Sequence, residues 1–169
     1  MNKELFNALG ISVITVTLNQ KDNLLNTINS ILQFRSANPN FLIEHIIVDG
    51  NSLDGTVELL NNLKNPTIRY ISENDNGMYQ AMNKGVKLAS FNYLVFINAG
   101  DIINIGTVSI DLVNKLKEGL KDEKLAGFAF SAIYKIGIKS RLIKSRYVTP
   151  SVPIMPSLHQ GMLYKRSLL

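Results

Sequence analysis

The stretch IIVDGNSLDGT, residues 46–56, passes from three β-branched residues directly into a loop of acids, an amide and glycines. Two further stretches show the same change of character, IRYISENDNGMY at residues 68–79 and LVFINAGD at residues 94–101. A short, almost continuous apolar run is typical of a strand that a parallel sheet buries on both faces. Ligands bind to such sheets just beyond the carboxyl ends of the strands. The three loops therefore predict one binding site, laid out like a nucleotide site, at a single edge of a parallel sheet.

Strands and helices alternate along the first 120 residues, and this alternation indicates a parallel sheet. The predicted fold class is α/β: a mostly parallel, Rossmann-like sheet flanked by helices, followed by a mixed or antiparallel β portion. The expected strands are residues 11–18, 42–48, 67–71 and 93–97, and the expected helices are residues 24–32, 56–63, 78–89 and 108–120. The later extended segments are residues 125–136, 138–148 and 159–164.

The composition is that of a soluble globular domain, with 46% hydrophobic and 18% charged residues in a chain of 169. A chain of this length is expected to form a single domain and to bury a substantial core. The absence of cysteine excludes disulfides and thiolate metal sites. No apolar run approaches the roughly 20 residues of a membrane-spanning helix. Residues 1–10 lack the charged region, the apolar region and the small-residue cleavage site that make up a signal peptide. We therefore expect a cytoplasmic protein.

The charge is unevenly distributed along the chain. The net charge is +5, but all 13 acids lie at or before Glu123, and residues 124–169 contain Lys and Arg without any acid. A basic segment of this kind predicts an anionic partner, which is a nucleic acid, a membrane surface or a phosphorylated substrate. The alternative is a solvated basic face with no partner.

The first two strand ends offer groups that recognise a nucleoside. Thr17 and Asn19 follow the first strand, where backbone and amide groups can bond the edge of a base, although Asn19 could instead cap the next helix. Asp49 ends the second strand, where a carboxylate accepts from a base N–H or a ribose hydroxyl. The alternative for Asp49 is an acid satisfied within its own loop. Gly50 permits a sharp turn, and Ser52 either lines the site or caps the following helix.

The third loop opens a helix, whose N-terminus favours a phosphate. Asp75 either caps this helix or binds a sugar hydroxyl, and Gly77 permits close approach of a ligand. Tyr79 follows in the first turn. Asn83 and Lys84 lie on the next turns, where Lys84 either meets a phosphate or is an exposed helical lysine.

Asp101, after the fourth strand, is the candidate metal ligand. A hard divalent cation that bridges phosphates needs only one or two protein carboxylates and water. The alternative for Asp101 is an N-cap. His159 follows a proline-rich bend and is a second candidate for the metal or the diphosphate, with a structural histidine as the alternative, whereas His45 is expected to be structural. We expect Asp49 and Asp101 to converge on one pocket.

In order and spacing, these motifs resemble family 2 glycosyltransferases, especially bacterial enzymes that build surface polysaccharides. The resemblance extends over residues 11–166 and rests on VTLN at residues 16–19, on residues 46–56, on SENDNGMYQAMNKG at residues 72–85 and on NAGD at residues 98–101. It implies a GT-A fold that holds a nucleotide-sugar donor at the carboxyl edge of the sheet. The nucleotide-sugar contacts it implies are Thr17, Asn19, Asp49, Gly50, Ser52, Asp75, Gly77, Tyr79, Asn83, Lys84, Asn98, Ala99 and Gly100.

The resemblance also implies an activity: sugar transfer with inversion from a nucleoside-diphosphate donor, expected to be a UDP-sugar, to a glycan or lipid-linked acceptor. Mn²⁺ or Mg²⁺ would be held by Asp101, with His159 as a second ligand. Within a single domain, residues 1–101 would form the nucleotide-binding half and residues 102–169 a partial acceptor half. The basic stretch of residues 135–146 would contact an anionic acceptor or the inner face of the membrane, and a homo-oligomer is also expected.

The sequence departs from the family pattern at three points. Ala99 stands where the first acid of the metal motif is expected, and Met82 replaces the arginine of an Ala-Arg-Asn-x-Gly motif. The motif that supplies the catalytic base would follow His159 after a further helix. We therefore name no base and expect it beyond Leu169, in a chain truncated at its C-terminus.

Three other functions compete with this one. The missing base motif favours an inactive nucleotide-sugar-binding module or a partner subunit. A dinucleotide-dependent oxidoreductase predicts a glycine-rich turn after the first strand, but residues 17–21 contain no glycine. A nucleic-acid partner is not expected, because only Tyr134 and Tyr147 interleave with the basic residues, which is too few for a stacking surface.

Overall fold

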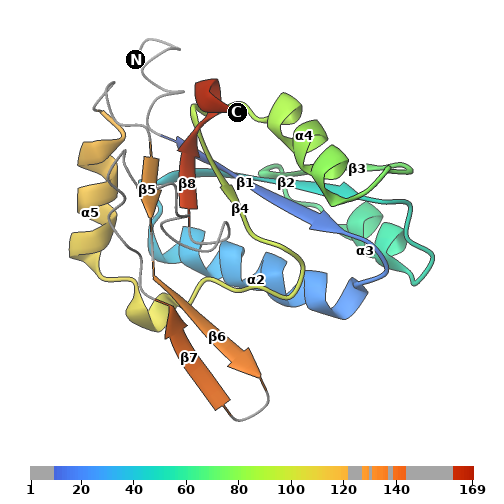
Figure 1. Cartoon of the computed structure of the whole chain (residues 1–169), viewed down its shortest axis with the longest axis horizontal. Coiled ribbons are helices and arrows are strands. Elements are labelled where there is room, and N and C mark those ends of the chain that lie inside the picture. Colours follow the sequence, from blue (N-terminus) through green and yellow to red (C-terminus); the bar gives the residue numbers. More distant parts are fainter. Residues whose placement is uncertain (1–9, 122–126, 130, 137–138, 144–161) are drawn as a thin grey trace, which may run out of the picture.

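The computed structural model of the chain combines one large sheet with helices on both of its faces (Figure 1). The structure describes residues 10–121, 127–129, 131–136, 139–143 and 162–169. The candidate ligand His159 lies outside these residues. Within the described ranges, no helix is both long and apolar enough to cross a lipid bilayer.

The large sheet has six strands in the order β3-β2-β1-β4-β8-β5. The four strands that precede residue 100 run parallel to one another, and β8 pairs antiparallel with both β4 and β5. The predicted fold class, a mostly parallel sheet with a mixed C-terminal portion, is confirmed. The strands are β1 (Gly10–Thr17), β2 (Leu42–Asp49), β3 (Ile68–Ser72), β4 (Tyr93–Phe96), β5 (Gly127–Ala129) and β8 (Met162–Lys165).

A second sheet consists of a hairpin, β6 (Ala132–Ile136) and β7 (Lys139–Ile143). The two strands pair antiparallel, and they lie within the extended segments of residues 125–136 and 138–148 that the sequence predicts. Figure 1 shows this hairpin extending away from the large sheet. Ile133 and Leu142, which are cross-strand partners, are both exposed on it.

The helices are α2 (Lys21–Ala37), α3 (Thr56–Asn62), α4 (Met78–Leu88) and α5 (Ile110–Gly119), with short 3-10 helices η1 (Ile105–Thr107) and η3 (Arg166–Leu168). α4 covers one face of the sheet, where Ala81 and Met82 pack among buried residues of β1, β2 and β4. The approach is close: a Cβ placed on Gly85 would lie 2.4 Å from Ile14 Cγ2. A side chain at position 85 would therefore force Ile14 or α4 to shift.

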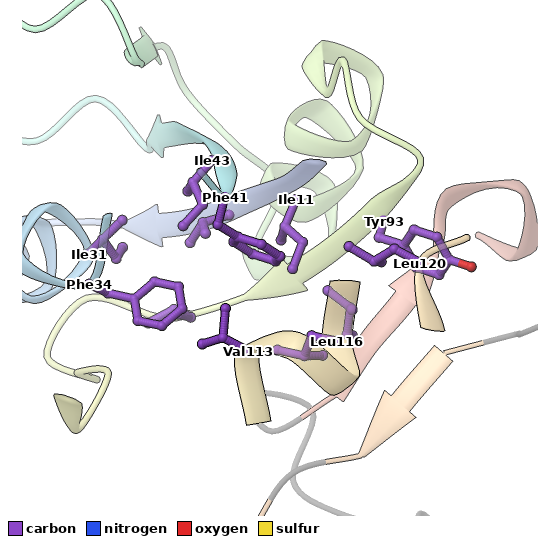
Figure 2. Packing of buried hydrophobic residues seen from close by; sticks show 12 residues of the cluster. Ile11, Ile31, Phe34, Phe41, Ile43, Tyr93, Val113, Leu116 and Leu120 are labelled. Carbon is purple, nitrogen blue, oxygen red and sulfur yellow. The ribbon is translucent and has the colours of Figure 1, made fainter. Parts of the chain in front are cut away.

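The opposite face is covered by α2, α3 and α5. α2 and α5 pack against β1, β2 and β4 in one cluster, shown in Figure 2, and α2 and α3 pack against Ile47 in another. Phe34 of α2 meets Phe41 edge to face, with ring centroids 6.2 Å apart. This two-sided coverage explains why the strands read as continuous apolar runs.

A partly buried glutamate and a buried histidine lie within this framework. Glu44 of β2 accepts from Ser12 Oγ at 2.5 Å and from the Ser90 backbone N–H at 2.6 Å, and it pairs with Arg69 at 2.6 Å. Burial alone would raise the pKa of Glu44, but the Ser12 and Ser90 hydrogen bonds and the Arg69 charge together lower it. His45, on the other face, bonds Thr15 Oγ1 through Nε2 at 2.8 Å, and burial lowers its pKa to about 3. It is a neutral core residue, as expected.

Candidate nucleotide-binding site

The loops after β1, β2 and β3 meet at the carboxyl edge of the sheet, beside the first turn of α4. A pocket of about 270 Å³ opens there. Its walls come from three segments far apart in sequence, because parallel strands bring their carboxyl ends to one edge. The lining residues are Val16, Thr17, Leu18, Gly50, Asp75, Gly77, Met78 and Ala81.

Two buried oxygens line this pocket without a hydrogen-bond donor among the described residues. They are Thr17 Oγ1 and Asp75 Oδ2. The Asp75 side chain is only 8% exposed, and its other oxygen, Oδ1, lies 2.5 Å from Lys84 Nζ. Buried polar atoms in proteins almost always have a partner. These two oxygens can therefore accept from water or from a ligand in the pocket, whose remaining surface is largely apolar.

Asp49 lies beside this pocket but is directed into the protein. Its side chain is fully buried, and it accepts from Ser52 N at 3.0 Å, from Ser72 Oγ at 2.6 Å and from Ser52 Oγ. Both carboxylate oxygens are thus satisfied by neighbouring loops. The nucleotide contact of Asp49 stays a prediction, and what the structure shows for this acid is a framework role.

Asn19 and Ser52 join the first two loops. Asn19 Oδ1 accepts from Leu53 N at 2.8 Å, and Asn19 N donates to Ser52 Oγ at 2.7 Å. Asn19 adopts a φ of 51° and does not cap α2, whose N-cap is Gln20. A Cβ placed on Gly50 would lie 3.3 Å from Leu18 Cδ1, a tight contact that the exposed Leu18 side chain would have to relieve. The left-handed residue in this turn is Asn51, with a φ of 66°.

The residues predicted at the start of α4 divide into two groups. Gly77 is the N-cap, with a φ of 114°, so Asp75 does not cap this helix. Tyr79 and Asn83 are exposed, and their predicted contacts with the donor stay predictions. The Lys84 ammonium is directed back toward the β3–α4 loop, where it meets Glu73, Asn74 and Asp75.

The loop after β4 is fixed by a residue of α2 that sequence reasoning missed. Thr27 Oγ1 accepts from Gly100 N at 2.9 Å and donates to Asp101 O at 2.8 Å. Gly100 has a φ of 98°, which only glycine adopts readily. The available signal was a threonine on the apolar face of α2, where a buried hydroxyl needs a partner. Asn98 and Ala99 belong to the same turn.

This turn holds the Asp101 side chain exposed at the edge of the sheet. Among the described residues, no cluster of three or more His, Cys, Asp or Glu forms a metal site. A cation that takes most of its ligands from a diphosphate and water needs no such cluster. The exposed, hard carboxylate of Asp101 therefore fits Mg²⁺ or Mn²⁺ bound together with a nucleotide.

Residues 12–148, most of the chain, match the family model for glycosyl transferase family 2. The chain belongs to this family. An uncharacterized glycosyltransferase of Mycobacterium tuberculosis is 32% identical over 123 residues, which are 73% of this chain and 46% of that protein. The poly-β-1,6-N-acetyl-D-glucosamine synthase of Staphylococcus aureus is 28% identical over 97 residues, 56% of this chain and 23% of the synthase. The chain thus spans less than half the length of these relatives.

Solved glycosyltransferases share the fold. The Staphylococcus aureus TarS fragment 1–349, in complex with UDP-GlcNAc, superposes with a TM-score of 0.65 at 20% identity, over 95% of this chain and 46% of that fragment. A Pyrobaculum calidifontis mannosyltransferase, in complex with GDP-Man and Mn²⁺, superposes with a TM-score of 0.54 at 20% identity, over 69% of this chain and 34% of the enzyme. This family 2 chain therefore has the GT-A fold that the sequence predicts.

Proposed function

We propose that this family 2 chain binds a nucleoside-diphosphate sugar, with a UDP-sugar as the donor, and belongs to an enzyme that transfers the sugar with inversion to a glycan or lipid-linked acceptor. The observation that carries the proposal is the pair of unsatisfied acceptors, Thr17 Oγ1 and Asp75 Oδ2, in an otherwise apolar pocket. A flat base with N–H donors suits such a pocket. The nucleotide sugars bound by TarS and the mannosyltransferase support the same ligand class.

In this proposal the base lies between Leu18 and Met78, and the diphosphate extends toward the turn of residues 98–101. Asp75 accepts from an N–H of the base or from a ribose hydroxyl. Gly77 leaves room at the N-terminus of α4, a position that favours a phosphate. Asn98, Ala99 and Gly100 face the diphosphate through their backbone. Asp49 and Ser52 support the wall of the pocket.

Asp101 would hold a divalent cation, with His159 as a second candidate ligand. A cation bound there neutralises the charge that develops on the leaving diphosphate. The acceptor hydroxyl attacks the anomeric carbon, the bond from that carbon to the diphosphate oxygen breaks, and a general base takes the hydroxyl proton. None of the described residues is assigned as this base.

For the acceptor, we propose that the β6–β7 hairpin provides an anion-binding surface. Lys139 and Arg141 are exposed on β7, beside the exposed apolar pair Ile133 and Leu142. Basic and apolar side chains together suit a lipid-linked phosphate at an anionic membrane surface.

Calorimetric titration with UDP, with and without Mn²⁺, tests the donor assignment. We expect UDP to bind, to bind more tightly with Mn²⁺, and to lose the Mn²⁺ dependence in Asp101→Asn. Absence of binding to UDP and to GDP would contradict the proposal. Release of UDP from UDP-GlcNAc by a longer gene product would then separate an enzyme from an inactive binding module.

A further inference from the structure

We propose that Lys84 is a positioning residue for nucleotide binding: it holds Asp75 so that one carboxylate oxygen faces the pocket, and it makes no contact with phosphate itself. The inference rests on the proposed function, and it assigns to Lys84 a role other than the phosphate contact that the sequence suggests. Three features support it: the environment of the ammonium group, the position of Asp75 and the contrast with Lys87, the next lysine of α4.

The Lys84 ammonium is fully engaged by a single loop. Nζ lies 2.5 Å from Asp75 Oδ1, 2.8 Å from Glu73 Oε1 and 3.0 Å from the Asn74 carbonyl oxygen. An ammonium group has three N–H donors and no acceptor. Three acceptors therefore use all three donors, and a phosphate could be bound only by breaking one of these contacts.

These contacts orient Asp75. Oδ1 faces Lys84, whereas Oδ2 faces Gly50 across the pocket, since a Cβ placed on Gly50 would lie 3.7 Å from Oδ2. A buried carboxylate is costly unless it is paired. Lys84 supplies that pair from the side away from the pocket, so that the second oxygen remains available to a ligand.

The same contacts fix the loop that carries Asp75. Asn74, whose carbonyl accepts from Lys84, receives a hydrogen bond on its side-chain oxygen from Asn51 Nδ2 at 3.1 Å. Lys84 thus joins α4 to the loops after β3 and β2, which form two walls of the pocket. Hydrogen bonds to Asp75 and then Glu73 raise the pKa of Lys84, so the ammonium stays charged.

Lys87 provides a matched control on the same helix. Its side chain is exposed and makes no hydrogen bond or ion pair with the described part of the chain. Lys87→Met removes the same charge from α4 as Lys84→Met without disturbing the β3–α4 loop. A general loss of positive charge near the site would affect both variants alike.

The test compares the binding of uridine and UDP to the wild type, Lys84→Met and Lys87→Met, by NMR titration and calorimetry. We expect Lys84→Met to weaken both ligands by about the same factor, on the order of 10-fold, because the affected contact is to the nucleoside. Lys87→Met is expected to change either affinity by less than about twofold. Weakening of UDP but not of uridine would place Lys84 on the phosphates and overturn the inference, as would unchanged affinity for both ligands.

A double-mutant cycle with Asp75→Asn tests whether Lys84 acts through Asp75. We expect Lys84→Met to add less than about a further twofold loss when Asp75 is already Asn, because coupled residues are not additive. Independent, multiplicative losses would overturn the inference. If Lys84→Met does not fold, as judged by circular dichroism, Lys84→Gln and Lys84→Arg replace it in the same cycle. A wild type that binds neither uridine nor UDP would refute the proposed function, and the positioning role would fall with it.

Discussion

Thr27 links the core of the protein to the turn that carries Asp101, and replacing it with valine tests that link. Valine keeps the shape of threonine but has no hydroxyl, so Gly100 N and Asp101 O lose partners at 2.9 Å and 2.8 Å. Thr27 is fully buried, so water cannot simply replace the hydroxyl. Leaving a buried group unsatisfied costs about 1–3 kcal/mol. With a urea dependence of about 2 kcal/mol per M, a loss of about 2 kcal/mol lowers the midpoint by roughly 1 M.

The functional consequence concerns the metal. A loosened turn no longer holds Asp101 in one place, so we expect Thr27→Val to weaken the Mn²⁺-dependent part of UDP binding by about 10-fold. UDP binding without Mn²⁺ should change little. Thr27→Ser keeps the hydroxyl and should retain most of the Mn²⁺ effect.

Thr67→Val is the control for stability alone. Thr67 Oγ1 also makes two bonds, accepting from Arg35 and donating to Asn65, both at 2.7 Å, but it lies before the start of β3, at the opposite edge of the sheet. The reasoning is refuted if Thr27→Val has the same unfolding midpoint and the same Mn²⁺ effect on UDP binding as the wild type. It is also refuted if Thr67→Val loses as much of the Mn²⁺ effect as Thr27→Val does.

Three further predictions concern the framework. Gly85→Ala forces a Cβ to within 2.4 Å of Ile14 Cγ2, so thermal melting should show destabilisation by about 1–3 kcal/mol despite the better helix propensity of alanine. The pKa of Glu44 is lower in the folded than in the unfolded protein, so its ionised form stabilises the fold above the unfolded pKa of 4.5, and this stability is lost as the pH falls through the folded pKa. Urea titrations should therefore show that the stability of Glu44→Gln depends less on pH in acid than that of the wild type. An unchanged pH dependence would contradict this prediction. His45 has a pKa of about 3 in the folded protein and 6.5 in the unfolded protein. The unfolded state therefore gains a proton first as the pH falls, so the free energy of unfolding decreases from pH 6.5 toward pH 3. Measured between these pH values, the stability of His45→Gln should depend less on pH than that of the wild type.

Much of the fold is predictable from the sequence because it depends on local periodicity. The apolar runs ending at Val48 and Ile71 predict two strands, and the spacing of Met78, Ala81 and Met82 predicts α4. The predicted first strand, residues 11–18, ends one residue later than β1 does in the structure. Leu18 is apolar enough to read as strand, but it is exposed in the loop, and Asn19 after it adopts a positive φ.

The site was predictable only in part, because its decisive contacts join residues that are distant in sequence. The position of Asp75 before a helix makes it a candidate, but nothing local shows that Lys84, two turns into α4, pairs with one of its oxygens. The place of Asp49 after a strand makes it a candidate too, and nothing local shows that Ser72 of β3 donates to one of its oxygens. Thr27 lies 74 residues from Asp101, and no spacing rule connects them.

The most direct measurement is a titration of the ¹⁵N-labelled chain with UDP, followed by its amide resonances. We predict that the largest shifts occur at Leu18, Gly50 and Gly77, around the pocket, and that the residues of the β6–β7 hairpin are unaffected. Shifts that leave the pocket amides unchanged, or that cluster on the hairpin, would contradict the assignment of this edge of the sheet as the nucleotide site.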